Sequence, residues 1–188
     1  MSLTIQQLEH NKAKFLETNE KYNIMTKDLL DFLGDDFYTA PASTSLTMVG
    51  CYPGGLLNYI ITACKYAIKI NQILPESIRQ PQPSIVKTTF LCQIGKVFMF
   101  CLSTDDKVIK QGKIYEFCDE SVRLRVGERS IYYATKYGVA LTEEEFQAIL
   151  NLDKDNDDKM AKYFSSSLAS IIKWGFELAI LEEKNGKK

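Results

Sequence analysis

The run from Leu56 to Ile70, LLNYIITACKYAIKI, puts apolar side chains on most faces of a helix. A helix at the surface of a protein keeps a polar face, so a helix that is apolar on nearly every side is predicted to lie at the centre of the fold. The remaining elements are then expected to pack around it. A chain organised in this way is expected to form a mostly α protein.

Further helices are predicted on both sides of the central one. The expected ranges are 3–21, Lys27–Phe32, Ser84–Ile94, Arg129–Tyr137, a helix that begins after Thr142, and Ser166–Glu183. Thr142 and Glu145 match a capping box, in which each side chain accepts a hydrogen bond from the backbone amide of the other residue. The segment from Gly34 to Gly55 carries two prolines and four glycines, and we expect it to be irregular.

Residues 97–118 have a different character. Aromatic and β-branched side chains there flank the turn-prone sequences STDDK and KQGK, a pattern typical of a small β-hairpin. Its aromatic residues are Phe98, Phe100, Tyr115 and Phe117. They are candidates for an exposed contact patch, and the alternative is that the hairpin covers its own core with them. The predicted fold class is therefore mostly α, a helical bundle with a small β-hairpin excursion around residues 97–118.

The chain has 188 residues, and 45% of them are hydrophobic, which suits a domain with a sizeable core. We expect a single domain over 1–188, in which an N-terminal helical segment, 1–35, packs on a core, 36–184. Residues 185–188 are expected to form a frayed tail.

Charge and hydropathy exclude some classes of function. The net charge of −1 argues against a dedicated nucleic-acid-binding surface. The apolar runs are too short to span a bilayer, so no membrane contact is expected. The N-terminus, MSLTIQQLEHNK, lacks the charged-then-apolar order of a signal peptide. These features predict a cytoplasmic protein.

Histidine occurs once, at His10, which excludes metal centres that need two or more imidazoles. His10 lies in a polar segment, and we expect it to be a solvated helix residue. The five cysteines contain no C-x-x-C pair, and their odd number predicts reduced thiols rather than a disulfide framework. Cys64 and Cys92 lie in apolar surroundings and are expected to pack as small hydrophobic residues.

Asp153, Asp155 and Asp157 have the spacing with which an EF-hand loop begins. The loop also needs Gly at its sixth position and Glu at its twelfth, where this chain carries Asp158 and Phe164. Without the bidentate glutamate most of the calcium affinity is lost. This segment is therefore expected to be a solvated acidic turn.

Several short motifs occur along the chain in one order. They are PAST at 41–44, PGGLL at 53–57, IGK at 94–96, VGERS at 126–130, YGVALTEEE at 137–145, and a last helix that begins with SSLA and ends with EEK. With these motifs the chain resembles the HD-domain superfamily of metal-dependent phosphohydrolases, especially its short bacterial and phage members. The resemblance implies an HD-like helical bundle for the core.

HD enzymes hold their metal with a histidine early in the helix after PGGLL, a His-Asp pair, and an aspartate in the last helix. At the matching positions this chain carries Tyr59, the pair Cys92 and Gln93, and Phe176. A divalent ion that activates water needs several carboxylate or imidazole ligands around one point, which these residues do not supply. The resemblance therefore implies a catalytically inactive pseudoenzyme with no metal and no cofactor. Its former site is expected either to be filled as core or to be a repurposed pocket.

Three functions stay open for such a chain. The first is a protein-interaction or scaffold module that binds a protein partner or itself. The alternative is a metal-free protein that sequesters a nucleotide or cyclic nucleotide, since HD substrates are phosphorylated nucleosides and Lys and Arg bind phosphate without a metal. Its candidate residues are Lys96, Arg123, Arg125, Arg129 and Lys173. The third is an active phosphohydrolase with a displaced site, for which the candidate acids are Asp119, Glu120, Glu128 and Glu177. No pair of these acids has a spacing that favours it.

Overall fold

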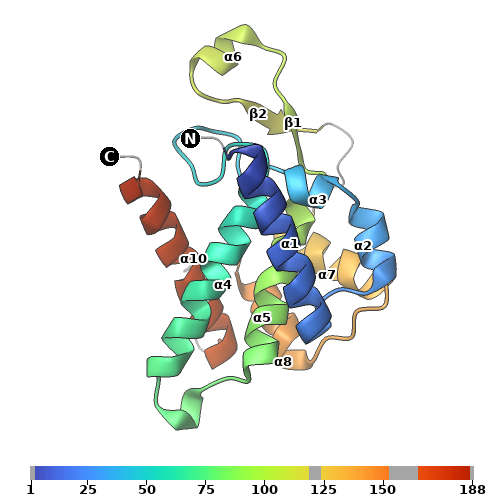
Figure 1. Ribbon diagram of the computed structural model, residues 1–188, viewed down its shortest axis with the longest axis vertical. Coiled ribbons are helices and arrows are strands. Elements are labelled where there is room, and N and C mark those ends of the chain that lie inside the picture. Colours follow the sequence, from blue (N-terminus) through green and yellow to red (C-terminus); the bar gives the residue numbers. More distant parts are fainter. Residues whose placement is uncertain (1–2, 119–123, 153–164, 187–188) are drawn as a thin grey trace.

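The computed structural model describes residues 3–118, 124–152 and 165–186, and its body is a bundle of helices from which a small hairpin projects at one end (Figure 1). The helices are α1 (Ile5–Tyr22), α2 (Lys27–Leu33), α3 (Asp36–Thr39), α4 (Gly55–Ile73), α5 (Gln82–Leu91), α6 (Asp106–Lys110), α7 (Val126–Lys136), α8 (Glu143–Asn151) and α10 (Ser167–Gly186). Two 3-10 turns, η1 (Glu76–Ile78) and η2 (Ile94–Lys96), precede and follow α5. Strands β1 (Phe100–Leu102) and β2 (Tyr115–Phe117) form the hairpin. The predicted fold class, mostly α with a small hairpin, is confirmed.

Helix α4 lies among the other long helices, with α10 on one side and α1 and α5 on the other (Figure 1). Its side chains Leu56, Ile60 and Ala67 are fully buried, as expected from a helix that is apolar on most faces. Close packing with α10 depends on Gly175, because a Cβ there would lie 2.7 Å from the carbonyl oxygen of Ala63. The prediction that this helix is central is confirmed.

Aromatic side chains of the N-terminal helices pack against the rest of the core. The ring of Phe15 lies 4.9 Å from that of Phe37 and 5.3 Å from that of Phe90, measured between centroids. On α2, the ring of Phe32 stacks on Tyr137 at 4.5 Å, beyond the end of α7. Such ring pairs add to the stability that burial alone provides. The buried side chains from Phe15 in α1 to Ala179 in α10 form one continuous core cluster.

The turn after α5 is held against α7 by a small polar contact. The hydroxyl of Ser130 accepts the N–H of Gly95 at 2.9 Å and donates to the carbonyl oxygen of Cys92 at 3.1 Å. A Cβ at position 95 would clash with the carbonyl oxygen of Val126. The glycine of the IGK motif therefore permits the close approach of η2 and α7.

Helix α8 begins with the predicted capping box. The backbone amide of Glu145 donates to the hydroxyl of Thr142 at 3.2 Å, and the amide of Thr142 donates to the Glu145 carboxylate at 3.0 Å. That carboxylate also accepts the Ser84 hydroxyl at 2.9 Å and pairs with the ammonium group of Lys87 at 2.8 Å. The same residue therefore caps α8 and joins it to α5.

Several boundaries differ from those predicted. The helix expected at Arg129–Tyr137 is α7, which begins three residues earlier, at Val126, and ends at Lys136. The helix expected at Ser84–Ile94 is α5, which ends at Leu91 before the separate turn η2. The segment expected to be irregular contains α3, whose four residues are too short to produce a helical periodicity. Helix α10 continues to Gly186, so the first two residues of the expected frayed tail are helical, and 187–188 lie outside the described residues. In the described part of the chain, no helix combines the length and the apolar character needed to cross a membrane.

Candidate functional site

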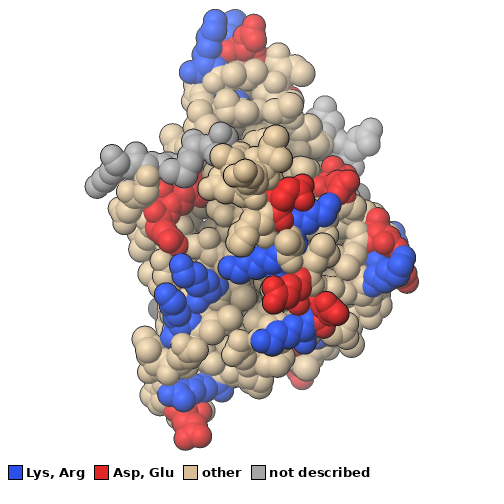
Figure 2. All heavy atoms as spheres, in the orientation of Figure 1, with Lys and Arg blue, Asp and Glu red and all other residues tan. Residues whose placement is uncertain are grey.

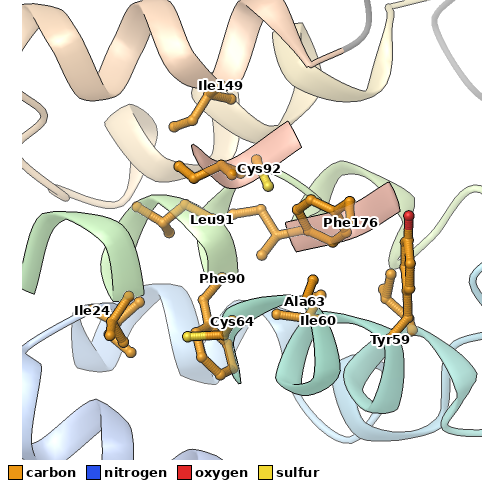
Figure 3. Close-up of a cluster of buried hydrophobic side chains, with 14 of the residues drawn as sticks. Ile24, Tyr59, Ile60, Ala63, Cys64, Phe90, Leu91, Cys92, Ile149 and Phe176 are labelled. Atoms are coloured by element: carbon orange, nitrogen blue, oxygen red, sulfur yellow. The ribbon is translucent and has the colours of Figure 1, made fainter. Parts of the chain in front are cut away.

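The four residues that the sequence analysis aligned with HD metal ligands are buried, and we call them the Tyr59 cluster. Tyr59 comes from α4, Phe176 from α10, and Cys92 and Gln93 from the two residues directly after α5. All four side chains are buried. The ring centroids of Tyr59 and Phe176 are 4.9 Å apart, and Figure 3 shows the ring of Phe176 between Tyr59 and Leu91. The rings of Tyr59 and Phe176 therefore pack against each other at the interface between α4 and α10.

The chemistry of the Tyr59 cluster does not fit a divalent metal ion. Burial raises the pKa of the Tyr59 phenol, and the neighbouring Cys92 adds to the shift, so the phenol stays neutral. The thiol of Cys92 lies 3.1 Å from the carbonyl oxygen of Thr89, to which it donates, and Phe176 has no donor atom. Among the residues that the structure describes, no group of three or more His, Cys, Asp or Glu side chains is arranged to hold a metal ion.

Gln93 differs from the other members of the Tyr59 cluster in carrying a buried side-chain amide. Its side chain is buried, and its Oε1 has no hydrogen-bond partner among the described residues. A buried acceptor without a partner costs about 1–3 kcal/mol of stability.

A cavity of about 330 Å³ adjoins the Tyr59 cluster, between α4, α10 and the first residues of the chain. Its polar lining includes a hydrogen-bond network in which Asn58 and Tyr52 lead to the carboxylate of Glu183. Glu183 accepts the N–H of Gly50 at 3.1 Å and the hydroxyl of Tyr52 at 3.3 Å, and Asn58 donates to the Tyr52 oxygen at 3.1 Å. Burial, and then the charge of Glu183, raise the pKa of Tyr52 to about 12.

The sign of the charge in this cavity matters for what it can bind. Glu182 and Glu183 both line it, and none of the described lining residues is a lysine or an arginine. Two carboxylates in a partly enclosed space repel an anion and favour donors or cations. The cavity beside the Tyr59 cluster is therefore poorly suited to a phosphate group.

The predicted phosphate-binding residues lie elsewhere. The ammonium group of Lys96 donates to the carbonyl oxygen of Ala42 at 3.1 Å. Arg125 is exposed at the start of α7, Arg129 is buried one turn later on the same helix, and Lys173 is half-buried on α10. None of these four lines the cavity beside the Tyr59 cluster, and Arg123 lies outside the described residues.

The candidate acids of a displaced active site gain no support from their positions. The Glu128 carboxylate accepts the backbone amide of Arg125 at 2.9 Å, which caps α7, and Glu177 is exposed on α10. Asp119 and Glu120 lie outside the described residues, as does the acidic turn predicted at 153–158.

The hairpin that the sequence analysis predicted carries exposed apolar side chains on one face. In the antiparallel register Phe100 is opposite Phe117 and Leu102 is opposite Tyr115, so these four side chains share one face, which we call the hairpin face. The rings of Phe100 and Phe117 pack edge to face with centroids 5.2 Å apart. Tyr115 is buried, but Leu102 and Phe117 are 66% and 64% exposed. The predicted aromatic residues therefore divide between the two alternatives: Phe117 is exposed as in a contact patch, and Tyr115 is buried as in a hairpin that covers its own core.

The two edges of the hairpin differ in their backbone pairing among the described residues. The amide of Tyr115 donates to the carbonyl oxygen of Thr44 at 3.2 Å, and that of Leu46 donates to Gly112 at 2.8 Å, so residues 44–46 run beside β2. On the other side, the antiparallel alternation turns the amides of Phe100 and Leu102 away from β2. In the described part of the chain these two amides make no backbone hydrogen bond. Among the residues that the structure describes, no segment pairs with this side of β1, and we call it the open edge of β1.

The sequence analysis did not identify the 44–48 segment as part of this surface. Leu46 and Met48 are about half exposed beside the hairpin. The alternation of apolar and polar residues in SLTM was the available signal for an extended conformation. Its pairing with β2 joins residues about 70 positions apart, which local patterns do not reveal.

No family model matches the sequence, and neither a curated protein nor a solved structure matches it. The likeness to HD-domain proteins therefore remains a prediction from short motifs. Conclusions about function rest on the geometry of the Tyr59 cluster, its cavity and the hairpin.

Proposed function

We propose that this chain is a non-catalytic protein-interaction module that docks through the hairpin face and the open edge of β1. The single observation that carries the proposal is the exposure of Leu102 and Phe117 on a face that is apolar at all four positions. A contiguous exposed apolar face next to an unpaired strand edge is typical of a binding surface.

The geometry favours binding by strand addition. A partner strand beside β1 would pair with the outward amides of Phe100 and Leu102 and would extend the sheet of β1, β2 and residues 44–46. Apolar side chains of that strand would then cover the hairpin face. A two-stranded ribbon is marginally stable in water, so a further strand stabilises the hairpin as well as the complex. The partner is either an extended segment of another protein or β1 of a second copy.

The non-catalytic part of the proposal is supported by the Tyr59 cluster. If the HD resemblance holds, the metal ligands are replaced by the phenol of Tyr59, the thiol of Cys92, the amide of Gln93 and the phenyl ring of Phe176. The rings of Tyr59 and Phe176 pack against each other. An HD-like scaffold without metal ligands has no metal site for catalysis. Its function would then depend on contacts made by its surface.

A metal-free nucleotide-binding function is the alternative proposal, and it has less support. The cavity beside the Tyr59 cluster is lined by Glu182 and Glu183, and the candidate basic residues described do not line it. A nucleotide phosphate is better matched by Arg and Lys than by carboxylates.

Native mass spectrometry of gently purified protein over a range of concentrations tests the proposed docking surface. The wild-type chain is expected to form a dimer or to carry a co-purifying protein. The double variant Leu102→Glu with Phe117→Glu is expected to be a bare monomer, because two charges replace the exposed apolar contacts. The control variant carries Ile73→Glu with Leu181→Glu, which are also exposed but lie on α4 and α10, and it should keep the complex. A complex that survives in the double variant, or a bare wild-type monomer throughout, contradicts the proposal.

A further inference from the structure

A second surface, remote from the hairpin, has the form of a ligand groove. It lies between α1 and α4 over α5 and has a volume of about 420 Å³. Its lining residues are Lys14, Thr18, Tyr22, Ile61, Cys64, Lys65, Ile68, Lys69, Gln72, Val86 and Phe90. The volume lies within the range of small-molecule sites, which is roughly 300–1,000 Å³. We call this the α1–α4 groove.

The spacing of the lining residues shows that the groove is continuous along the helices. On α4 the series runs from Ile61 to Gln72 with steps of three, one, three, one and three residues, which keeps it on one helix face. At 1.5 Å per residue this face is about 16 Å long. On α1, Lys14, Thr18 and Tyr22 follow one another at intervals of four and form the facing wall. The groove is therefore an elongated channel.

The floor of the groove is apolar and uncharged. Val86 and Phe90 from α5 are buried, and Ile61 and Ile68 from α4 are half-buried beside them. Burial raises the pKa of the Cys64 thiol to about 12, so that side chain is also neutral. An elongated apolar floor suits an alkyl chain.

The rim of the groove is cationic. Lys14, Lys65 and Lys69 line it, and no acidic residue of the described chain does. None of these three lysines has a described carboxylate within ion-pair distance, while Lys65 and Lys69 lie 5.7 and 6.0 Å from the ring centroid of Tyr66. Figure 2 looks onto the face that carries α1 and α4, where basic and acidic atoms both stand among uncharged surface, so the positive charge at the groove comes from its own lining lysines. An anionic group at the mouth of the groove would meet positive charge from both walls.

We propose that the α1–α4 groove binds a single-chain anionic amphiphile, a medium-chain carboxylate such as dodecanoate. The alkyl chain lies along the floor between the walls, and the carboxylate is held at the rim by Lys14, Lys65 and Lys69. This site is independent of the hairpin, so it adds a ligand to the proposed interaction module and does not depend on docking there.

Titration calorimetry with dodecanoate, below the concentration at which it forms micelles, tests the proposal. Dodecyltrimethylammonium is the comparison ligand, because it has the same alkyl chain and the opposite charge. We expect dodecanoate to bind at least about tenfold more tightly than the cation, since three weak ion pairs add up to a difference of that order. The triple variant Lys14→Gln, Lys65→Gln, Lys69→Gln should abolish this preference.

Two further variants separate the groove from the general charge of the protein. The control triple variant changes Lys107, Lys110 and Lys113 of the hairpin region to Gln, which alters the net charge equally and should leave the preference unchanged. Thr18→Trp places a large side chain in the groove from the α1 wall and should weaken both ligands. A circular dichroism spectrum like that of the wild type checks that each variant is folded.

Three results would overturn the proposal. They are no measurable binding of dodecanoate, equal affinity for the two amphiphiles, and equal loss of preference in both triple variants. If an acidic amphipathic peptide binds in the groove while dodecanoate does not, the occupant is a protein helix and the amphiphile proposal is wrong. None of these outcomes alters the test of the hairpin.

Discussion

Removing the ring of Phe176 tests whether the Tyr59 cluster is packed core. The side chain is 4% exposed, and its ring contacts Tyr59 across the interface between α4 and α10. A buried Phe→Ala change typically costs about 3–5 kcal/mol, from lost transfer free energy and from the cavity that remains. Phe176→Leu keeps most of the volume and should cost less than about 1.5 kcal/mol. Phe176→Asp should cost at least as much as Phe176→Ala, because it buries a charge.

Urea unfolding followed by circular dichroism measures these differences. With an m-value of about 2 kcal/mol/M, Phe176→Ala should lower the unfolding midpoint by about 2 M. The matched control is Leu181→Ala on the same helix, where the side chain is 53% exposed and the change should stay within about 0.5 kcal/mol. If Phe176→Ala falls within about 1 kcal/mol of the wild type, the ring lines open space and the filled-core account of the cluster is refuted.

Three further predictions concern neighbouring parts of the fold. Lys87→Met should lower the free energy of unfolding by about 3 kcal/mol in the same assay, because it leaves the Glu145 carboxylate buried without its cation. Gly95→Ala should cost about 1–3 kcal/mol, since the new Cβ clashes with the carbonyl oxygen of Val126, and an unchanged midpoint would contradict the packing of η2 on α7. The pKa of Tyr52 is raised to about 12 in the folded state, above the usual 10.0, so the unfolded chain loses this proton first and stability should fall as the pH rises from 10 to 12. Thermal unfolding over this range should show a smaller fall for Tyr52→Phe, and equal falls would argue against the raised pKa.

Local patterns in the sequence were enough for the elements that depend on neighbouring residues. The apolar run of α4 and the capping box of Thr142 and Glu145 both involve residues within a few positions of each other, and the structure has them as predicted. The hairpin was also predicted, because β-branched and aromatic residues flank two turn sequences within about 20 positions.

The parts of the surface that carry the proposals could not be predicted in this way. Residues 44–46 cover the β2 side of the hairpin and leave β1 at the edge, and their pairing with β2 joins distant segments of the chain. The α1–α4 groove depends on how far α1 stands from α4 over Phe90, which no periodicity encodes. The i,i+4 pair Lys65 and Lys69 on an apolar helix was visible in the sequence. It indicates a cationic rim only together with Lys14 of α1, which lines the same groove.

Photo-crosslinking from Cys101 tests the interaction proposal most directly. This thiol is exposed on β1, whereas Cys51, Cys64 and Cys92 are buried, so a benzophenone maleimide can be attached there in a Cys118→Ser background. We predict crosslinks to β1 of a second copy or to an extended segment of another protein. Unlabelled wild-type chain should compete for them, and the Leu102→Glu, Phe117→Glu variant should not. A label at Ser77→Cys, introduced with Cys101→Ser, gives the background level. Crosslinks from Cys101 that stay at this background, or that both competitors reduce equally, would contradict docking through the hairpin.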